Sequence, residues 1–346
     1  MAINIGILGG SGYTGIELLR ILANHPHTDV TVITSRKYAG VKVSEVFPSL
    51  YGITDLTFTE PDTTRLAEAS DIVFTCVPHQ TAMNIVPALL KKGLKVIDLS
   101  ADFRLRDRET YERWYQKHVA PELLEEAVYG LPELYREQIA TARLIANPGC
   151  YPTSCILPLV PLLRTGIIQS EGIIIDSKSG TSGAGRSAST ATLFCEVNEG
   201  FKAYKIGEHR HTPEIEQELS VAAGTNIFVN FTPHLVPMSR GILSTIYALP
   251  ATGASETEIR ACLQDVYGSS RFIQVLPRGS FPNVSSVRGT NFCHMGLKID
   301  SRTGRLIVVS VIDNLCRGAS GQAVQNMNIM EGLNEITGLE TLALYP

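Results

Sequence analysis

The chain has 346 residues, of which 44% are apolar and 18% charged, and its formal net charge is −4. This composition is typical of a compact globular enzyme, and the length predicts two domains or one large α/β unit. The slightly negative charge provides no global basic field, so we do not expect a nucleic-acid partner.

The N-terminal segment MAINIGILGGSGYTG predicts a first strand. It is a poor secretion signal, because no cationic region precedes its apolar run and glycine ends that run early. No apolar stretch reaches the roughly 18 residues that a membrane span needs. The seven cysteines are scattered without a CxxC pair, which argues against a disulfide framework and a zinc ribbon. The sequence therefore predicts a soluble protein of the reducing cytoplasm.

The first part of the chain alternates short apolar runs with segments of helical periodicity. Strands are predicted at 3–8, 29–35, 72–77 and 95–100. Helices are predicted at 15–24 and 81–93, and Pro87 bends or starts the second. This alternation predicts βαβ units and a parallel sheet of the Rossmann type.

The pattern changes after about residue 148. Longer β-branched runs predict strands at 172–180, 226–237, 242–249, 272–277, 294–300 and 306–313. Few helices separate them, which favours a mixed or antiparallel sheet, and residues 318–333 are helical again.

The predicted fold class is therefore α/β with two domains. We expect a dinucleotide-binding Rossmann domain at 1–149, completed by the C-terminal segment 318–346. Residues 150–317 are expected to form an α+β domain for catalysis and oligomerisation.

A glycine-rich motif follows the first predicted strand and opens a helix. It fits G-x-G-x-x-G and consists of Gly10, Ser11, Gly12, Tyr13, Thr14 and Gly15. Its glycines serve the tight turn, the approach of a pyrophosphate to the backbone, and close packing of helix on strand. The helix N-terminus then offers N–H groups to the phosphates. The motif predicts dinucleotide binding, and a plain glycine-rich turn is the alternative.

The end of the second predicted strand favours NADP over NAD. An enzyme specific for NAD places an acidic residue about 20 residues beyond the glycines, and this chain has Ser35 and Arg36 there, followed by Lys37. A hydroxyl and cations suit a 2′-phosphate. The alternative is a solvated loop tip that happens to be basic.

Cys150 lies in the run NPGCYPT, ahead of an apolar helical segment. The dipole and N–H groups of a helix N-terminus stabilise a thiolate, and the same amides suit an oxyanion. Pro152 suits the first helical position. A buried, inert thiol is the alternative, and it is the reading we adopt for the other six cysteines.

With these motifs, the chain resembles the N-acetyl-gamma-glutamyl-phosphate reductases. The matching segments are GGSGYTG at 9–15, SADFR at 100–104, YGLPEL at 129–134, NPGCYPT at 147–153, SGTSGAGR at 179–186, HRHTPE at 209–214 and DNLCRGA at 313–319. They cover nearly the whole chain in order. A broader superfamily with the aspartate-semialdehyde dehydrogenases shares the glycine loop, the cysteine turn and the Asp-Asn-Leu segment.

The resemblance implies a reaction of arginine biosynthesis. N-acetyl-gamma-glutamyl phosphate and NADPH would give N-acetylglutamate semialdehyde, NADP and phosphate. Cys150 would attack the acyl phosphate, a thioester would form, and hydride would release the aldehyde.

A histidine is the expected base, because a group that titrates near neutrality both takes and gives a proton. His209 and His211 share a face only if their stretch is extended. Thr212 reads as an N-cap and Pro213 as the first helical position. We assign His211 as the base and His209 as a substrate contact. The alternatives are structural histidines or a His-x-His metal pair, and we expect no metal.

The remaining assignments are made partly by resemblance. Arg104 follows a strand end, where its guanidinium suits a phosphate or carboxylate, and a surface arginine is the alternative. The resemblance implies that Ser182 and Gly183 face the nicotinamide, that Arg186 is near the substrate, and that Asn314 binds the nicotinamide amide.

Two other functions compete with this one. Another acyl-phosphate reductase, such as an aspartate-semialdehyde dehydrogenase, would share the thioester chemistry. A non-catalytic NADP-binding protein would use Cys150 as a redox sensor. We expect a homodimer or homotetramer by family resemblance.

Overall fold

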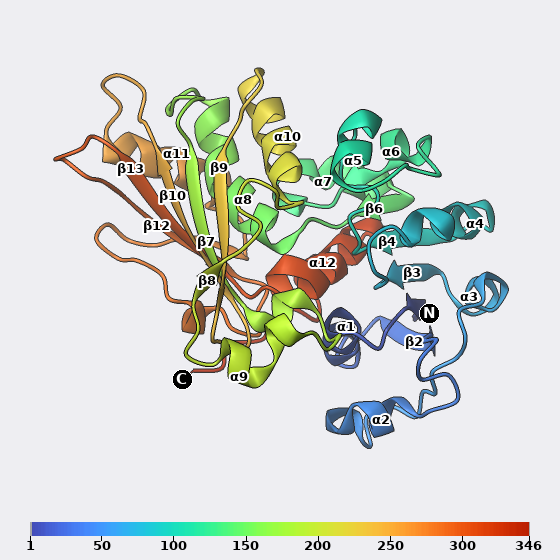
Figure 1. Ribbon diagram of the computed structural model, residues 1–346. Coiled ribbons are helices and arrows are strands. Elements are labelled where there is room, and N and C mark those ends of the chain that lie inside the picture. The colour runs from blue at the N-terminus through green and yellow to red at the C-terminus, as the bar shows by residue number, and fades with distance from the viewer. Residues whose placement is uncertain (1, 346) are drawn as a thin grey trace. The chain divides into compact units, whose positions relative to one another are not determined.

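The computed structural model describes residues 2–345, and the chain divides into two compact units (Figure 1). Unit 1 takes in Met1–Pro148 and Ala319–Glu340, and unit 2 takes in Gly149–Gly318 and Thr341–Pro346. The division therefore differs from the expected boundaries at the C-terminus, where the segment from Thr341 on groups with unit 2 rather than with the Rossmann unit.

Unit 1 contains a six-stranded sheet in the order β2-β1-β3-β4-β6-β5, and every pairing in it is parallel. Its strands are β1 (Ile3–Leu8), β2 (Thr28–Ile33), β3 (Ile72–Thr75), β4 (Lys95–Asp98), β5 (Val128–Tyr129) and β6 (Leu144–Ala146). All four residues of β3 are buried, as expected for a strand covered on both faces. The predicted parallel Rossmann sheet is confirmed.

The helices of unit 1 connect these strands. They are α1 (Tyr13–Leu22), α2 (Val43–Val46), α3 (Thr63–Ala69), α4 (Val86–Lys91), α5 (Arg108–Trp114), α6 (Leu123–Glu126), α7 (Pro132–Thr141) and α12 (Gly321–Met330). Two short 3₁₀ turns lie at Pro48–Leu50 and Ala82–Asn84. Helix α12 contacts α1, α7 and β4, and all ten of its residues are buried. It therefore closes the core of unit 1, although it is distant from that core in sequence.

Unit 2 contains a seven-stranded mixed sheet in the order β11-β12-β13-β10-β7-β9-β8. Its strands are β7 (Ile174–Gly180), β8 (Lys202–Ala203), β9 (Asn230–Val236), β10 (Ile242–Ala248), β11 (Ile273–Val275), β12 (Cys293–Ile299) and β13 (Leu306–Ile312). The pairs β7–β9 and β11–β12 are parallel and the others antiparallel. Burial alternates along β9 and β10, so one face of the sheet is the more covered.

Three long helices of unit 2 accompany this sheet: α8 (Cys150–Arg164), α10 (Thr212–Ala223) and α11 (Glu256–Tyr267). The shorter elements are α9 (Phe194–Val197) and 3₁₀ turns at Thr181–Ala184, Thr190–Thr192 and Val284–Ser286. A π-helical turn at Cys316–Ser320 begins in unit 2 and ends in the first residues of the segment Ala319–Glu340 of unit 1. Helix α8 contacts β10, β13, α10 and α11. Because neighbours surround it, its apolar residues continue around all sides.

Several elements differ from the sequence-based expectation. Strands β5 and β6 were not predicted, because two and three residues are too few to carry a period. Helix α11 was also not predicted, although Ser255 and Glu258 form a capping box at its start. Helix α1 begins at Tyr13 rather than at Gly15, since glycine is a weak helix former and masks the start. Pro87 is the second residue of α4, so it lies at the start of a helix within the expected helical segment.

Within residues 2–345, no helix is long and apolar enough to cross a membrane. All seven cysteines are free thiols.

Candidate active site

The glycine loop, residues 9–15, joins β1 to α1, and three of its glycines are required by the backbone. Gly9 has φ +80°, which a side chain rarely adopts. A Cβ on Gly10 would lie 2.4 Å from the Ile33 side chain, and one on Gly15 would lie 2.1 Å from the Gly10 carbonyl oxygen. These contacts draw the start of α1 tightly against β1 and β2.

Gly12 differs from these three. It is the N-cap of α1, and among the described residues nothing lies within 4 Å of a Cβ built on it. A side chain there would occupy open space ahead of the helix N-terminus, which is where the fingerprint requires a pyrophosphate to approach. The loop therefore fits a dinucleotide.

Ser11 and Ser35 meet at the end of β2. The Ser35 hydroxyl donates to Ser11 Oγ over 2.9 Å, and Ser35 is buried. Arg36, the next residue, is exposed, and the Lys37 ammonium lies 5.1 Å from the centre of the Tyr38 ring. The loop and the basic strand end are thus neighbours, as the NADP interpretation requires. Tyr13 and Thr14 lie in the first turn of α1, and the Thr14 carbonyl accepts the Ser320 hydroxyl over 2.9 Å.

Arg104 is buried in unit 1, following β4. Its Nε donates to the Asn147 carbonyl over 2.7 Å, and a terminal nitrogen donates to the Leu99 carbonyl over 3.0 Å. Asn147 in turn bonds Ala319 O over 3.1 Å, and its Oδ1 accepts from Asn326. Arg104 is therefore an internal support of the turn that leads to Cys150, and it is not a surface side chain.

Cys150 is the first residue of α8, after the extended N-cap Gly149. Thr153 closes the first turn through its N–H and its hydroxyl, both of which donate to the Gly149 carbonyl, over 3.0 and 2.9 Å. The Gly149 N–H donates to the Glu214 carboxylate over 2.8 Å, and Glu214 is buried. Pro152 is the third helical residue and not the first, as had been expected. Proline is tolerated at this position because the amides of the first turn have no hydrogen-bond partner within the helix.

The thiol of Cys150 is half-buried, which distinguishes it from the buried thiols of Cys155, Cys293 and Cys316. Burial raises the pKa of Cys155 to about 11. Such thiols remain protonated and inert at neutral pH. Cys150 combines partial exposure with the positive end of a 15-residue helix.

The two histidines precede α10, and His211 is its N-cap. Thr212, which was expected to be the N-cap, is therefore the first residue of the helix. The stretch is a turn and not extended, since the Thr212 N–H donates to the His209 carbonyl over 2.9 Å. The turn nevertheless brings the ring centres of His209 and His211 to 4.8 Å from each other.

An aromatic cluster surrounds the histidines. Its rings are those of Tyr151, Tyr204, His209, His211 and Phe231, and together with Cys150, the residue before Tyr151, we call it the cysteine–histidine cluster. The Tyr151 ring lies edge-on to both histidines, at 5.5 Å from His209 and 5.9 Å from His211 between centres. The Tyr151 hydroxyl donates to the His234 carbonyl over 3.1 Å. Because Tyr151 follows Cys150 in α8, its ring connects the helix that begins at Cys150 to the histidine turn.

The surroundings of His209 set its protonation state. Burial, together with the charges of Lys205 and Arg210, lowers the pKa of His209 to about 4. Its Nδ1 accepts the His211 backbone N–H over 3.1 Å. His209 is therefore neutral at pH 7 and fixed in one tautomer, with its other ring nitrogen carrying the hydrogen.

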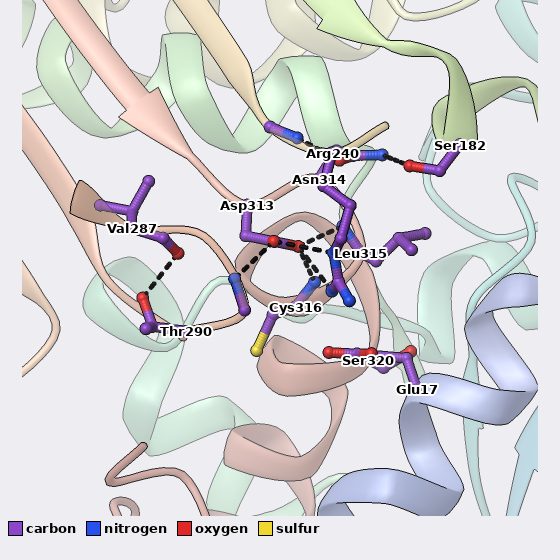
Figure 2. Close-up of polar contacts among 12 residues, drawn as sticks. Glu17, Ser182, Arg240, Val287, Thr290, Asp313, Asn314, Leu315, Cys316 and Ser320 are labelled. Atoms are coloured by element: carbon purple, nitrogen blue, oxygen red, sulfur yellow. Dashed lines mark hydrogen bonds and ion pairs between the residues drawn. The ribbon is translucent and has the colours of Figure 1, made fainter. Parts of the chain in front are cut away.

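In unit 2, Asn314 contacts Ser182 of the turn Thr181–Ala184 (Figure 2). Asn314 follows β13 and is buried; its Oδ1 accepts the Gly241 N–H over 2.7 Å and its Nδ2 donates to Ser182 Oγ over 3.0 Å. Gly183 lies in the same 3₁₀ turn as Ser182, and a Cβ on it would be 3.0 Å from Ser179 Oγ. Asn314 thus fixes the shape of this turn, a role that its spacing did not predict. Arg186 lies just beyond the turn and is exposed.

Sequence reasoning missed four polar residues of this region. They are Tyr151 and Glu214, described above, and the ion pair of Arg240 with Asp313 at 2.9 Å. Tyr151, Glu214 and Asp313 stand inside motifs quoted from the sequence, so their positions were visible but their partners were not. Among residues 2–345, no group of three His, Cys, Asp or Glu side chains is placed to hold a metal ion.

Comparisons with known proteins identify the same two parts. Residues 4–142 match the family model of the semialdehyde dehydrogenase NAD binding domain, and residues 150–314 match that of the semialdehyde dehydrogenase dimerisation domain. The first match supports a nicotinamide cofactor.

Curated relatives match the chain over its full length. The N-acetyl-gamma-glutamyl-phosphate reductase of Desulfotalea psychrophila is 59% identical over 345 residues, which is 99% of this chain and 100% of that protein. The reductases of Geotalea daltonii and Geobacter sulfurreducens are each 56% identical with the same coverage.

Solved structures of lower identity share the fold. Aspartate semialdehyde dehydrogenase II from Vibrio cholerae matches with a TM-score of 0.71 and 19% identity, covering 96% of this chain and 99% of that one. The Candida albicans aspartate semialdehyde dehydrogenase with NADP matches with a TM-score of 0.71 and 18% identity, at the same coverage. On the strength of its full-length relatives, the chain belongs to the N-acetyl-gamma-glutamyl-phosphate reductase family.

Proposed function

We propose that the chain reduces N-acetyl-gamma-glutamyl phosphate to N-acetylglutamate semialdehyde and phosphate, with NADPH, in arginine biosynthesis. The observation that carries the chemistry is the arrangement of Cys150, the first residue of α8, beside Tyr151, whose ring contacts His211 at the start of α10. A half-buried thiol at a helix N-terminus with a histidine nearby is suited to nucleophilic catalysis.

In the proposed first step, the Cys150 sulfur attacks the acyl carbon of the substrate. The bond from that carbon to the phosphate oxygen breaks, phosphate leaves, and a thioester forms on Cys150. The N-terminus of α8 stabilises the thiolate before the attack and the carbonyl oxygen during it. The nicotinamide, when bound, supplies a hydride. The carbon–sulfur bond then breaks, and the aldehyde is released with the Cys150 thiolate restored.

His211 is proposed as the acid–base group. It takes the thiol proton before the attack. After reduction it gives a proton to the substrate oxygen and removes that proton again as the carbon–sulfur bond breaks, so that the aldehyde leaves with a free carbonyl. His209 is not suited to this exchange, because its pKa of about 4 keeps it neutral throughout the cycle. We propose that His209 instead donates a hydrogen bond from its Nε2 to the substrate, since its Nδ1 already accepts from His211.

The other binding roles follow from charge and position. Arg186 is exposed beyond the Ser182 turn, where a cation suits the phosphate or carboxylate of the substrate. For Arg104 we propose a positioning role in the turn before Cys150, because two of its donors bind backbone carbonyls. Asn314 and Ser182 are proposed to shape the turn that holds Gly183 against the nicotinamide.

NADP is proposed as the preferred cofactor. Ser35 is hydrogen-bonded to Ser11 of the glycine loop and Arg36 is exposed beside it, so a hydroxyl and a cation stand where NAD enzymes place an acid. We also propose a homo-oligomer, a homodimer or homotetramer, because unit 2 matches a dimerisation domain.

The reverse reaction tests the proposal directly. The purified protein is given phosphate and NADP with N-acetylglutamate semialdehyde, then with aspartate semialdehyde, and NADPH absorbance is followed. We expect phosphate-dependent NADPH formation with the acetylated aldehyde alone. Turnover only with the aspartate compound would replace the substrate assignment, and NADP binding without turnover of either would replace the enzymatic one.

A further inference from the structure

The segment that follows β13 packs directly on the proposed nucleophile. A Cβ built on Gly318 would lie 2.6 Å from Cys150 Cβ and 3.1 Å from Cys150 Cα. Ordinary carbon–carbon contact is about 3.5 to 4.0 Å. The nearer of the two clashes involves the first side-chain atom, and the other involves the backbone, so a rotamer change of Cys150 relieves neither. Only glycine permits this approach.

The segment has an unusual backbone. Residues Cys316–Ser320 form a π-helical turn, with Gly318 at its centre. Such turns are rare and often occur at functional sites, because the extra residue redirects the helix surface. Here the turn faces Cys150 with the backbone of Gly318, which carries no side chain.

The Asp313 carboxylate holds this turn in shape (Figure 2). Asp313 is fully buried, and its Oδ1 accepts the N–H groups of Leu315 and Cys316 over 2.9 and 2.8 Å. Its Oδ2 accepts the Gly289 N–H over 2.7 Å. The Arg240 guanidinium binds both oxygens, at 2.9 and 3.0 Å, and offsets the buried charge.

Asp313 also reaches Gly318 through its backbone, since its carbonyl accepts the Gly318 N–H over 2.9 Å. The beginning and the centre of the turn are therefore tied to one residue. Asn314, next to Asp313, binds Gly241 and Ser182. A single buried segment thus supports both the Ser182 turn and the backbone at Cys150.

We propose that Gly318 and Asp313 are positioning residues for the nucleophile: the bare backbone at Gly318, held by Asp313, fixes Cys150 at the N-terminus of α8. The proposal rests on the role of Cys150 in the proposed function. Its consequence is that a single methyl group at position 318 displaces the sulfur from its place, because Cys150 is the residue nearest to that methyl group.

The test compares Gly318→Ala with Gly268→Ala. Gly268 lies in the same unit, is exposed at the end of α11, and a Cβ on it would be 2.7 Å from the Gln264 carbonyl, so the steric demand is similar. We expect kcat of Gly318→Ala to fall roughly 100-fold, the scale of a 1 Å misplacement, with KM for NADPH unchanged. Gly268→Ala is expected to keep wild-type kcat.

A second readout does not depend on turnover. Iodoacetamide labelling of the Cys150 peptide is followed by mass spectrometry as a function of pH. We expect the midpoint of labelling to move to higher pH in Gly318→Ala, because the displaced thiolate loses the support of the helix N-terminus. Wild-type kcat and a wild-type labelling profile in Gly318→Ala would overturn the proposal, as would equal losses in Gly268→Ala.

Asp313→Asn keeps the test decisive if Gly318→Ala does not fold. The two carboxylate oxygens of Asp313 accept from different donors, whereas an asparagine amide has only one oxygen that can accept. One set of hydrogen bonds is therefore lost and the turn loosens. The labelling midpoint is again expected to move to higher pH. An unchanged midpoint would overturn the proposal. If wild-type protein shows no reductase activity while both variants shift the midpoint, the proposed function fails and the positioning role stands.

Discussion

The glycine loop of unit 1 and the cysteine–histidine cluster of unit 2 are built in different ways. The loop is one continuous segment, and its shape follows from the missing Cβ atoms of Gly9, Gly10 and Gly15. The cluster draws its side chains from α8, β9 and the turns before α10. The first is specified by one short segment and its packing on the neighbouring strands, and the second exists only once side chains from several distant segments have packed.

The difference affects how each region should respond to mutation. Removing a side chain from the cluster is expected to remove one chemical step while leaving the cofactor bound. Changing the residues around the loop is expected to alter cofactor choice while leaving the chemistry intact. The following predictions test that separation.

The largest effect is expected at Cys150. Cys150→Ser should lower turnover by at least about 1000-fold, because the thioester cannot form and a serine hydroxyl stays protonated. NADP affinity, measured by fluorescence titration, should stay within about threefold of wild type. Substantial residual turnover would remove Cys150 as the nucleophile.

His211→Asn is expected to lower kcat roughly 100-fold or more, the scale of general acid–base catalysis. His209→Asn serves as the matched comparison, since the two rings are neighbours, and it should mainly raise KM for the acyl phosphate. Steady-state kinetics of both variants separate the roles. A far larger loss of kcat in His209→Asn would reverse the assignment.

Arg36→Asp tests the loop region. An acid in place of the cation should repel a 2′-phosphate and accept the ribose hydroxyls of NAD, shifting the NADP/NAD ratio of kcat/KM roughly 10- to 100-fold toward NAD. Arg302→Asp, an identical change at a side chain that is 85% exposed near Asp300, should leave the ratio unchanged. An unaltered ratio in Arg36→Asp would mean that the 2′-phosphate is recognised elsewhere.

The smallest effect concerns stability in unit 1. Burial and the charge of Asp102 raise the pKa of Asp98 to about 6, while an unfolded aspartate titrates near about 4. The folded state therefore holds this proton more tightly than the unfolded state does. The contribution of Asp98 to the free energy of unfolding is fully present below about pH 4 and is lost as pH rises through about 6. It amounts to on the order of 2–3 kcal/mol.

Urea unfolding of wild type and Asp98→Asn between pH 4 and 7 measures this contribution. The wild type should lose stability relative to the variant as pH rises, whatever their absolute stabilities. Parallel curves would show that Asp98 does not titrate in this window.

Much of the fold was predictable from the sequence because periodicity is a local property. The strand at 3–8, the change to longer strands after about residue 148 and the helix at Cys150 are each written in consecutive residues. The short β5 and β6 carry too few residues for any period, and they form because neighbouring strands offer them hydrogen-bonding partners.

By itself, the sequence determined the glycine loop, the candidate nucleophile, the histidine pair and the family resemblance, since each depends on residue types at fixed spacing. Tertiary structure alone decided that His209 is buried and neutral, that Arg104 bonds backbone carbonyls, and that Gly318 packs on Cys150. These properties depend on burial and on contacts between residues far apart in the chain. A pKa or a steric limit arises from what surrounds a group in space, and spacing along the chain does not contain that information.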